Sequence, residues 1–186
     1  MALSNYALCE INDVKKDMGI DVLETKQDEV IAALINAYSV AIENHLHKKI
    51  INRDLTEKYD GDGTAILWLD YYPINSITEL KIDDEVISSD DYYLYEKLGK
   101  IILDGLVFTK GYQNVEISYN VGYGASKDTI PTPIRQSCVA LVHFYIKRHT
   151  IDYSETFDEG FVATLLGTDM PSFVLKWLDS YKKVRV

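Results

Sequence analysis

Asn114-Val115-Glu116-Ile117-Ser118-Tyr119-Asn120-Val121 alternates polar and apolar side chains from end to end. Successive side chains of a β-strand point to opposite faces of the sheet, so this alternation predicts a strand with one face in a core and one in solvent. Gly122-Tyr123-Gly124 follows directly, without the glycine spacing, the following helix or the lysine of a nucleotide-binding loop. We therefore interpret these residues as the end of the strand.

The residues before this strand carry further strand and turn patterns. Gly61-Asp62-Gly63 and Lys97-Leu98-Gly99 each separate two short β-like runs, so each predicts a hairpin. Asp83-Asp84-Glu85 predicts another polar turn. These connections are too short for the crossovers that parallel strands need, so an antiparallel β-unit is expected at about 55–123. Its expected earlier strands are 57–60, 64–69, 76–82, 92–96 and 100–104.

Apolar residues recur at helical spacing on both sides of this β-unit. Asn12 and Gly19 are expected to cap a first helix of about two turns, and Thr25 to cap a longer helix that ends near Lys48. Thr132 is expected to cap a third helix, with Pro133 at its first position. A last helix is expected from about Met170.

This order predicts an α+β fold, a small α-helical bundle with an antiparallel β-unit inserted between its long helices. The helices should occupy about 11–50 and 132–182, the β-insert about 55–123, and the whole chain 1–186 should form a single domain. The helical stripes predict one apolar cluster. Its expected members are Leu34, Ile42, Leu141, Tyr145 and Trp177.

Composition limits the classes of function. The chain has 186 residues, 47% of them hydrophobic, and a formal net charge of −10. This balance supports a real core and argues against a protein that grips nucleic acid, although it allows one that lets DNA pass. The 14 tyrosines suit either protein–protein interfaces or ordinary strands.

We find no convincing catalytic, cofactor-binding or metal-ligating residues. His45 and His47 point to different faces of a helix, and His143 and His149 are also off one face. No GxSxG or HExxH motif is present. The acidic turns, of which Asp60-Gly61-Asp62-Gly63 faintly resembles a calcium loop, are interpreted as solvated turns. Cys9 and Cys138 are far apart in sequence, and Cys138 is expected to be a buried free thiol.

Four strings, in the same order, resemble the small head–tail connector (head-completion adaptor) family of tailed bacteriophages. The first is a short helix ending in Met18-Gly19-Ile20, and the second is the long helix at 29–43. The third combines Tyr59-Asp60-Gly61 with Pro73-Ile74-Asn75-Ser76-Ile77, and the last is the strand at 114–123 followed by Ile130-Pro131. The helix at 173–181 is also similar to the short closing helix of that family.

The resemblance implies a structural virion protein without enzymatic activity or cofactor. It implies self-association into a ring of about twelve copies with heterologous interfaces. The ring would dock under the portal protein, extend the DNA channel without binding DNA specifically, and offer a platform to the next connector or tail-completion protein. The expected location is the virion neck, after synthesis in the host bacterial cytoplasm. No membrane partner is expected, because no signal peptide or run of about 20 apolar residues is visible.

Three other interpretations remain open. The chain could be a tail-completion protein of the same virion, a small metal-dependent enzyme built on the acidic turns, or a regulatory binding module. The acidic segment 150–160, an expected exposed loop, matches nothing in the connector family. It and the basic tail 182–186 are the segments expected to order on docking, since both are polar and lack a packing pattern.

Overall fold

The computed structural model describes residues 2–149 and 170–182, so the segment 150–160 and most of the basic tail lie outside the described residues. The fold is mixed α/β with antiparallel sheets. Two compact units are present: residues 1–51 with 124–186 form a helical unit, and residues 52–123 form a β-unit. None of the described helices is long and apolar enough to cross a membrane.

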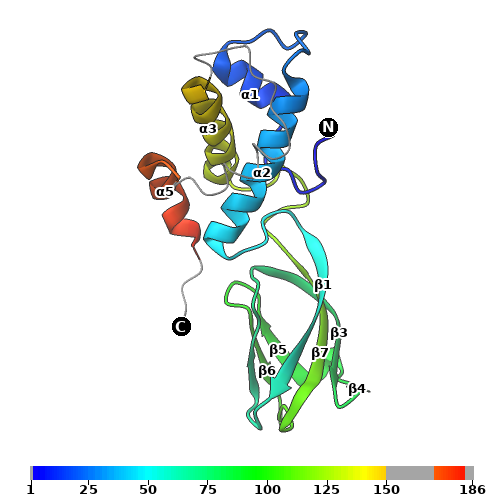
Figure 1. Cartoon of the computed structure of the whole chain (residues 1–186). Helices are drawn as coiled ribbons and strands as arrows, with labels where there is room; N and C mark the ends of the chain where they lie inside the picture. Colours follow the sequence, from blue (N-terminus) through cyan, green and yellow to red (C-terminus); the bar gives the residue numbers. More distant parts are fainter. Residues whose placement is uncertain (1, 150–169, 183–186) are drawn as a thin grey trace. The chain divides into compact units, whose positions relative to one another are not determined.

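The helical unit contains α1 (Ile11–Met18), α2 (Asp28–Leu46), α3 (Thr132–His149) and α5 (Ser172–Leu178). Its helix α3 contacts α1, α2 and α5 (Figure 1). Gly19 ends α1 at a φ of 70°, as expected for a residue that must adopt a left-handed conformation. The two long helices thus come together from opposite ends of the sequence.

The expected residues at the starts of the helices are wrong by one or two positions. Glu10, and not Asn12, caps α1, because Glu10 and Asp13 form a reciprocal capping box that satisfies two backbone N–H groups. Gln27 precedes α2 in place of Thr25. The third helix already begins at Thr132, which is therefore its first residue and not its cap. The preference of Asn and Thr for helix N-caps did not reveal the capping box of Glu10 and Asp13.

A buried lysine fixes the loop between α1 and α2. The Lys15 side chain is only 1% exposed and lies 2.5 Å from an Asp28 carboxylate oxygen. Its ammonium group donates to the carbonyl oxygens of Val22, at 3.2 Å, and Glu24, at 2.6 Å. These partners offset the cost of removing the charge from water.

The core prediction for the helical unit is wrong in one member. Leu34, Ile42, Leu141 and Tyr145 are buried, whereas Trp177 is 44% exposed. Val174 and Leu178, one turn apart, form the buried stripe of α5. Trp177 lies one position off this stripe and instead packs edge-on against Phe173, with ring centroids 5.6 Å apart.

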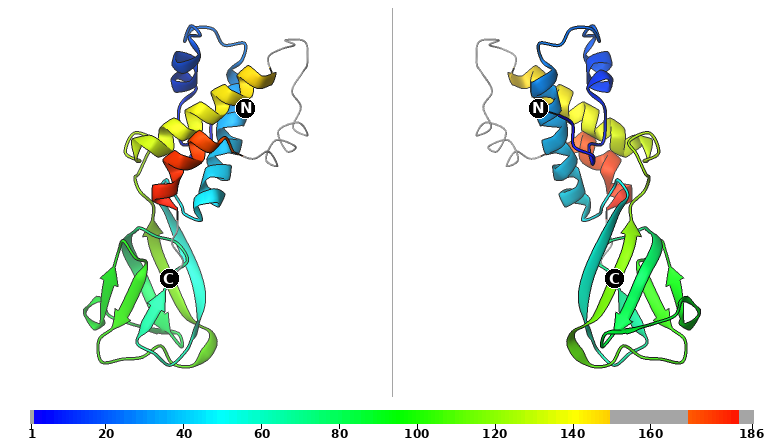
Figure 2. Two further views of the ribbon diagram at one scale, coloured as in Figure 1. Left: turned by 90° about the vertical axis from the view of Figure 1, so that its left-hand side faces the viewer. Right: turned by 90° about the vertical axis from the view of Figure 1, so that its right-hand side faces the viewer.

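The β-unit consists of two antiparallel sheets, seen as two layers in Figures 1 and 2. The first has the order β1 (Arg53–Gly61), β7 (Gly111–Val121), β3 (Ile74–Ile82) and β4 (Glu85–Val86). The second has the order β2 (Ile66–Trp68), β6 (Lys100–Leu103) and β5 (Tyr92–Tyr95). The most clearly alternating stretch of the sequence, in β7, is confirmed as a strand and lies between β1 and β3.

Of the two expected glycine hairpins, one is confirmed. Tyr95 pairs with Lys100 across the turn that joins β5 to β6. The hairpin expected at residues 61–63 is wrong, because β1 pairs with β7 while β2 pairs with β6. Gly61 lies so close to the Thr109 backbone that an added Cβ would stand 1.8 Å from its carbonyl oxygen. Here the glycine permits a close approach of two chain segments instead of a tight turn.

The inward faces of the two sheets share one apolar core. Tyr119 of β7 is 1% exposed and is among the largest side chains in this core. Its hydroxyl donates to Glu57 at 2.5 Å, and Tyr59 donates to the same carboxylate oxygen at 2.6 Å. Burial and the bond to Glu57 raise the pKa of Tyr119, so the phenol stays protonated. Some of the tyrosines are thus core residues and not interface residues.

Candidate interaction surfaces

The outward face of the three-stranded sheet is rich in aromatic and aliphatic side chains. Cross-strand pairs place six residues on it in two rows, Trp68–Lys100–Tyr95 and Ile66–Ile102–Tyr93. Trp68 is 47% exposed, Tyr93 58% and Tyr95 44%. We call these six residues the aromatic sheet face. Clustered exposed aromatic residues are typical of protein–protein interfaces.

Lys100 lies at the centre of one row of this face. Its ammonium nitrogen is 4.3 Å from the centroid of the Tyr95 ring and 5.5 Å from that of the Trp68 ring. Such cation–π contacts orient the two rings. Among the ion pairs of the described residues, none joins Lys100 to a carboxylate. The face therefore combines a large apolar area with one central positive charge.

The outward face of the four-stranded sheet has the opposite character. Lys58 pairs with Glu116 at 3.1 Å, and Lys81 pairs with Glu79 at 2.5 Å. Hydrogen bonds between neighbouring strands join further polar side chains, Thr56 with Ser118 and Asn120 with Asp54. These groups satisfy one another, so this face suits contact with water.

The loops at the far end of the β-unit from its residues 52 and 123 form a third exposed region. Asp83 and Asp84, with φ of 52° and 67°, form the expected polar turn, whereas Glu85, also expected in this turn, is the first residue of β4. Thr109 and Asn114 donate to the Asp83 carboxylate and lower its pKa. Tyr112 is 94% exposed in this region. The loops are ordered by their own hydrogen bonds around a few exposed side chains.

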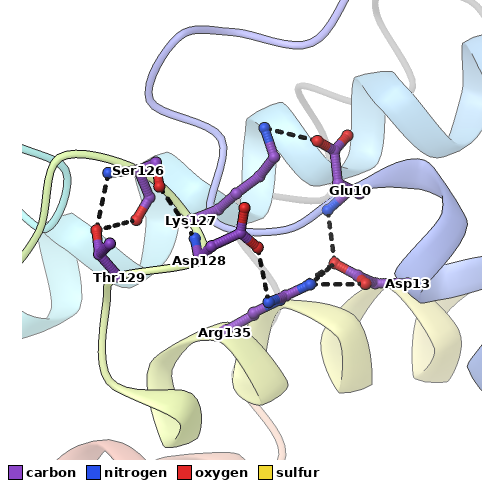
Figure 3. A network of polar contacts seen from close by, with 7 residues as sticks. All are labelled: Glu10, Asp13, Ser126, Lys127, Asp128, Thr129 and Arg135. Carbon is purple, nitrogen blue, oxygen red and sulfur yellow. Dashed lines mark hydrogen bonds and ion pairs between the residues drawn. The ribbon is translucent and has the colours of Figure 1, made fainter.

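In the helical unit, a charged network joins the start of the chain to the start of α3 (Figure 3). The Arg135 guanidinium donates to both Asp13 carboxylate oxygens at 2.8 Å and to Asp128 at 3.1 Å. The bonds to Asp13 raise the pKa of Arg135. Beside them, Lys127 lies 2.7 Å from Glu10. The network connects segments more than a hundred residues apart in the sequence.

The loop that carries Lys127 and Asp128 is held by its own short-range bonds, also drawn in Figure 3. The Thr129 hydroxyl donates to the Ser126 carbonyl oxygen at 2.9 Å and accepts from the Ser126 N–H at 3.0 Å. The loop is thereby preorganised to present Asp128 to Arg135. The network is structural, since every partner is another side chain or backbone group of the same unit.

Replacing Arg135 by alanine is expected to lower the free energy of unfolding by about 1–2 kcal/mol, because Asp13 loses a bidentate charged partner in a partly exposed setting. Lys127→Ala removes a single, more exposed ion pair and is expected to cost less than about 0.5 kcal/mol. Urea unfolding followed by far-UV circular dichroism measures both. Equal losses of unfolding free energy for the two variants would contradict the larger contribution expected from Arg135.

The histidines considered as candidates lie apart from any assembled catalytic group in the described residues. His143 Nδ1 is 2.5 Å from one carboxylate oxygen of Asp17. Burial, together with the charge of Lys182, lowers the pKa of His45. The side chain of His149 lies outside the described residues. Within residues 2–149 and 170–182, no three His, Cys, Asp or Glu side chains are grouped so that they could hold a metal ion.

Both cysteines are buried and not in a disulfide, as expected for Cys138. The sequence did not indicate that Cys9 lies beside Cys138. This neighbouring thiol and burial raise the pKa of Cys9, which keeps the thiol protonated. Ser39 of α2 donates to the Ile35 carbonyl oxygen and accepts from the Leu8 N–H, so the first residues are anchored to the helices.

Comparison with known proteins identifies both a family and a set of structures. A family described as head completion protein matches residues 7–184. The neck of an empty GTA particle, computed with C6 symmetry, contains a chain that is 19% identical with a TM-score of 0.70. The neck of a native GTA particle, computed with C12 symmetry, contains one that is 17% identical with a TM-score of 0.65.

A chain in the virion of a native gene transfer agent (GTA) particle is 18% identical, also with a TM-score of 0.65. Each of these matches covers 100% of this chain and 94% of the other chain. The structures therefore share the fold of the whole chain, both units included. None of the curated proteins matches.

Proposed function

Because the chain belongs to the head completion protein family, we propose that it is a ring-forming head–tail connector in the neck of a tailed phage or phage-like particle. The family match confirms the resemblance inferred from the sequence. It is also the observation that carries the proposal, because it spans 7–184 and so includes residues of both units. In this proposal the chain works as one connector domain, a helical bundle with an inserted β-unit.

The proposed partners are the portal protein on one side and the next connector or tail-completion protein on the other. Copies of the chain associate into a closed ring, and DNA passes through without specific binding. Relatives of the same fold lie in necks computed with C6 and C12 symmetry, which supports a ring. The net charge of −10 supports a channel that does not hold phosphate groups.

In this role the chain needs no catalytic residue, metal or cofactor. Its working parts are surfaces, and a ring requires two different ones on each subunit. The aromatic sheet face and the polar face of the other sheet differ strongly in chemistry. The aromatic sheet face is therefore a candidate contact surface, whereas the polar face, whose charges pair with one another, suits contact with water. Synthesis in the host bacterial cytoplasm and assembly into the virion neck are part of the same proposal.

We expect the purified chain to be monomeric or weakly associated at low salt and to form rings mainly on portal particles. A net charge of −10 opposes self-association. Added salt weakens this repulsion, because at 0.1 M charges separated by more than about 10 Å are largely screened. Higher salt should therefore promote ring formation. Analytical ultracentrifugation across a salt series, with and without portal particles, measures the association.

Two results would contradict these expectations. Stable rings at low salt without portal would refute templated assembly. A chain that binds neither portal nor itself at any salt concentration would refute the connector role itself. Capsid particles of the same phage that lack the portal serve as the control for nonspecific adsorption.

A further inference from the structure

We propose that the aromatic sheet face is the surface on which a neighbouring copy of this chain docks, and that a carboxylate of that copy pairs with Lys100. This inference rests on the ring proposed above and names one of the surfaces through which its copies contact each other. It assigns the β-unit to subunit association.

The first argument is the apolar surface that this face of the sheet exposes to solvent. Trp68, Tyr93 and Tyr95 are each between 44% and 58% exposed, and Ile66 is 42% exposed beside them. Tryptophan and tyrosine dominate the binding energy of protein interfaces, because they bury much area at a low cost in side-chain entropy. A partner covering this face would therefore bind through these residues.

The second argument is the position of Lys100 between two rings. A partner that covers Trp68 and Tyr95 also removes the Lys100 ammonium from water, since the ammonium lies 4.3 Å and 5.5 Å from their ring centroids. A charge removed from water needs a charged partner. The occupant must therefore bring an anionic group, a carboxylate or a phosphate, into reach of Lys100.

The third argument identifies the occupant. A second copy of the chain has this chemistry, because it carries 29 acidic residues against 19 Lys and Arg. DNA phosphate fits less well, since Asp104 lies on the border of the face and accepts a hydrogen bond from Tyr93 at 3.2 Å. In a closed ring, copies meet through two different surfaces, and the aromatic sheet face supplies one of them.

Trp68 reports directly on this contact. In a Trp177→Phe background it is the only tryptophan left. When rings form on portal particles, before any other neck protein is added, we expect its emission to shift to shorter wavelength and its quenching by acrylamide to fall. The same protein free in solution, with Trp68 exposed, provides the reference. Rings in which Trp68 stays as accessible to acrylamide as in the free chain would overturn the proposal.

Substitutions test the same contact by assembly. Trp68→Ala with Tyr95→Ala should raise the concentration needed for rings on portal by at least about 30-fold, as expected for residues central to an interface. Lys100→Met should weaken assembly, and Lys100→Glu should weaken it further by placing like charges together. Tyr112→Ala removes a side chain of the same size as Tyr95 outside the face and serves as the control. Circular dichroism establishes that each variant is folded.

Cross-linking identifies the neighbour. With p-benzoylphenylalanine in place of Tyr93, irradiation of assembled rings should join two copies of the chain. Cross-links only to portal, or only to the next neck protein once it is added, would assign the face to that partner and overturn the proposal. If the wild-type chain forms rings and the variant with Trp68→Ala and Tyr95→Ala forms them equally well, the docking surface alone is refuted. A wild-type chain that forms no ring would instead refute the proposed function.

Discussion

Tyr119→Ala is expected to lower the free energy of unfolding of the β-unit by about 3–5 kcal/mol, the usual range when a buried aromatic side chain is truncated. Tyr119 lies on the central strand β7, is 1% exposed and belongs to the core shared by both sheets. The substitution leaves a cavity between the sheets. It also removes one of the two hydroxyl donors to the Glu57 carboxylate.

Two variants separate the contributions to this loss. Tyr119→Phe retains the ring and removes the hydroxyl, so it should cost about 1.5–3 kcal/mol, the effect of one hydrogen bond to a charged group. Tyr112→Ala, at a side chain that is 94% exposed, should change stability by less than about 0.5 kcal/mol. Urea unfolding in the Trp177→Phe background, followed by Trp68 fluorescence, reports on the β-unit. A loss for Tyr119→Ala no larger than that for Tyr119→Phe would show that the ring is not part of the core.

Leu141→Ala is expected to cost about 2–5 kcal/mol in the helical unit. Leu141 lies on α3, is 2% exposed, and shares the buried side of that helix with Cys138 and Tyr145. Helix α3 contacts α1, α2 and α5, so a cavity there weakens the packing of the whole unit. In the sequence α2 precedes the β-unit and α3 follows it, so the contact between these helices depends on side-chain packing. Few local hydrogen bonds can compensate for the loss of this packing.

Gln136→Ala on the exposed side of the same helix is the matched control and should change stability by less than about 0.5 kcal/mol. Urea unfolding in a Trp68→Phe background, followed by Trp177 fluorescence, reports on the helical unit. A loss below about half a kcal/mol for Leu141→Ala would mean that Leu141 does not belong to the core.

Local patterns predicted the elements of this fold well where one face of the element is buried. The alternation at residues 114–121 correctly indicated β7, because period two follows from the geometry of a single strand. Gly19 was correctly expected at the end of α1, since only its own backbone angle decides that position.

Partners distant in sequence were harder to predict. One row of the aromatic sheet face depends on two cross-strand pairs, Trp68 with Lys100 and Lys100 with Tyr95. Local patterns predicted only the pair of Lys100 and Tyr95, because these two residues flank an expected hairpin turn. The network of Arg135 and Asp13 joins residues 122 positions apart, and neither residue stands out in its own segment. The tyrosines likewise looked alike in sequence, whereas Tyr119 is core and Tyr93 is surface.

The sequence by itself determined the order of the helices and of every strand except β4, the antiparallel character of the β-unit and the resemblance to head–tail connectors, because each follows from short-range periodicity or short strings. Only the tertiary structure decided that β1 and β2 belong to different sheets and that Trp177 faces outward from α5. The physical reason is the same in both cases. Which sheet a strand joins, and which stripe of a short helix is buried, depend on apolar area and hydrogen bonds supplied by residues far away in the chain.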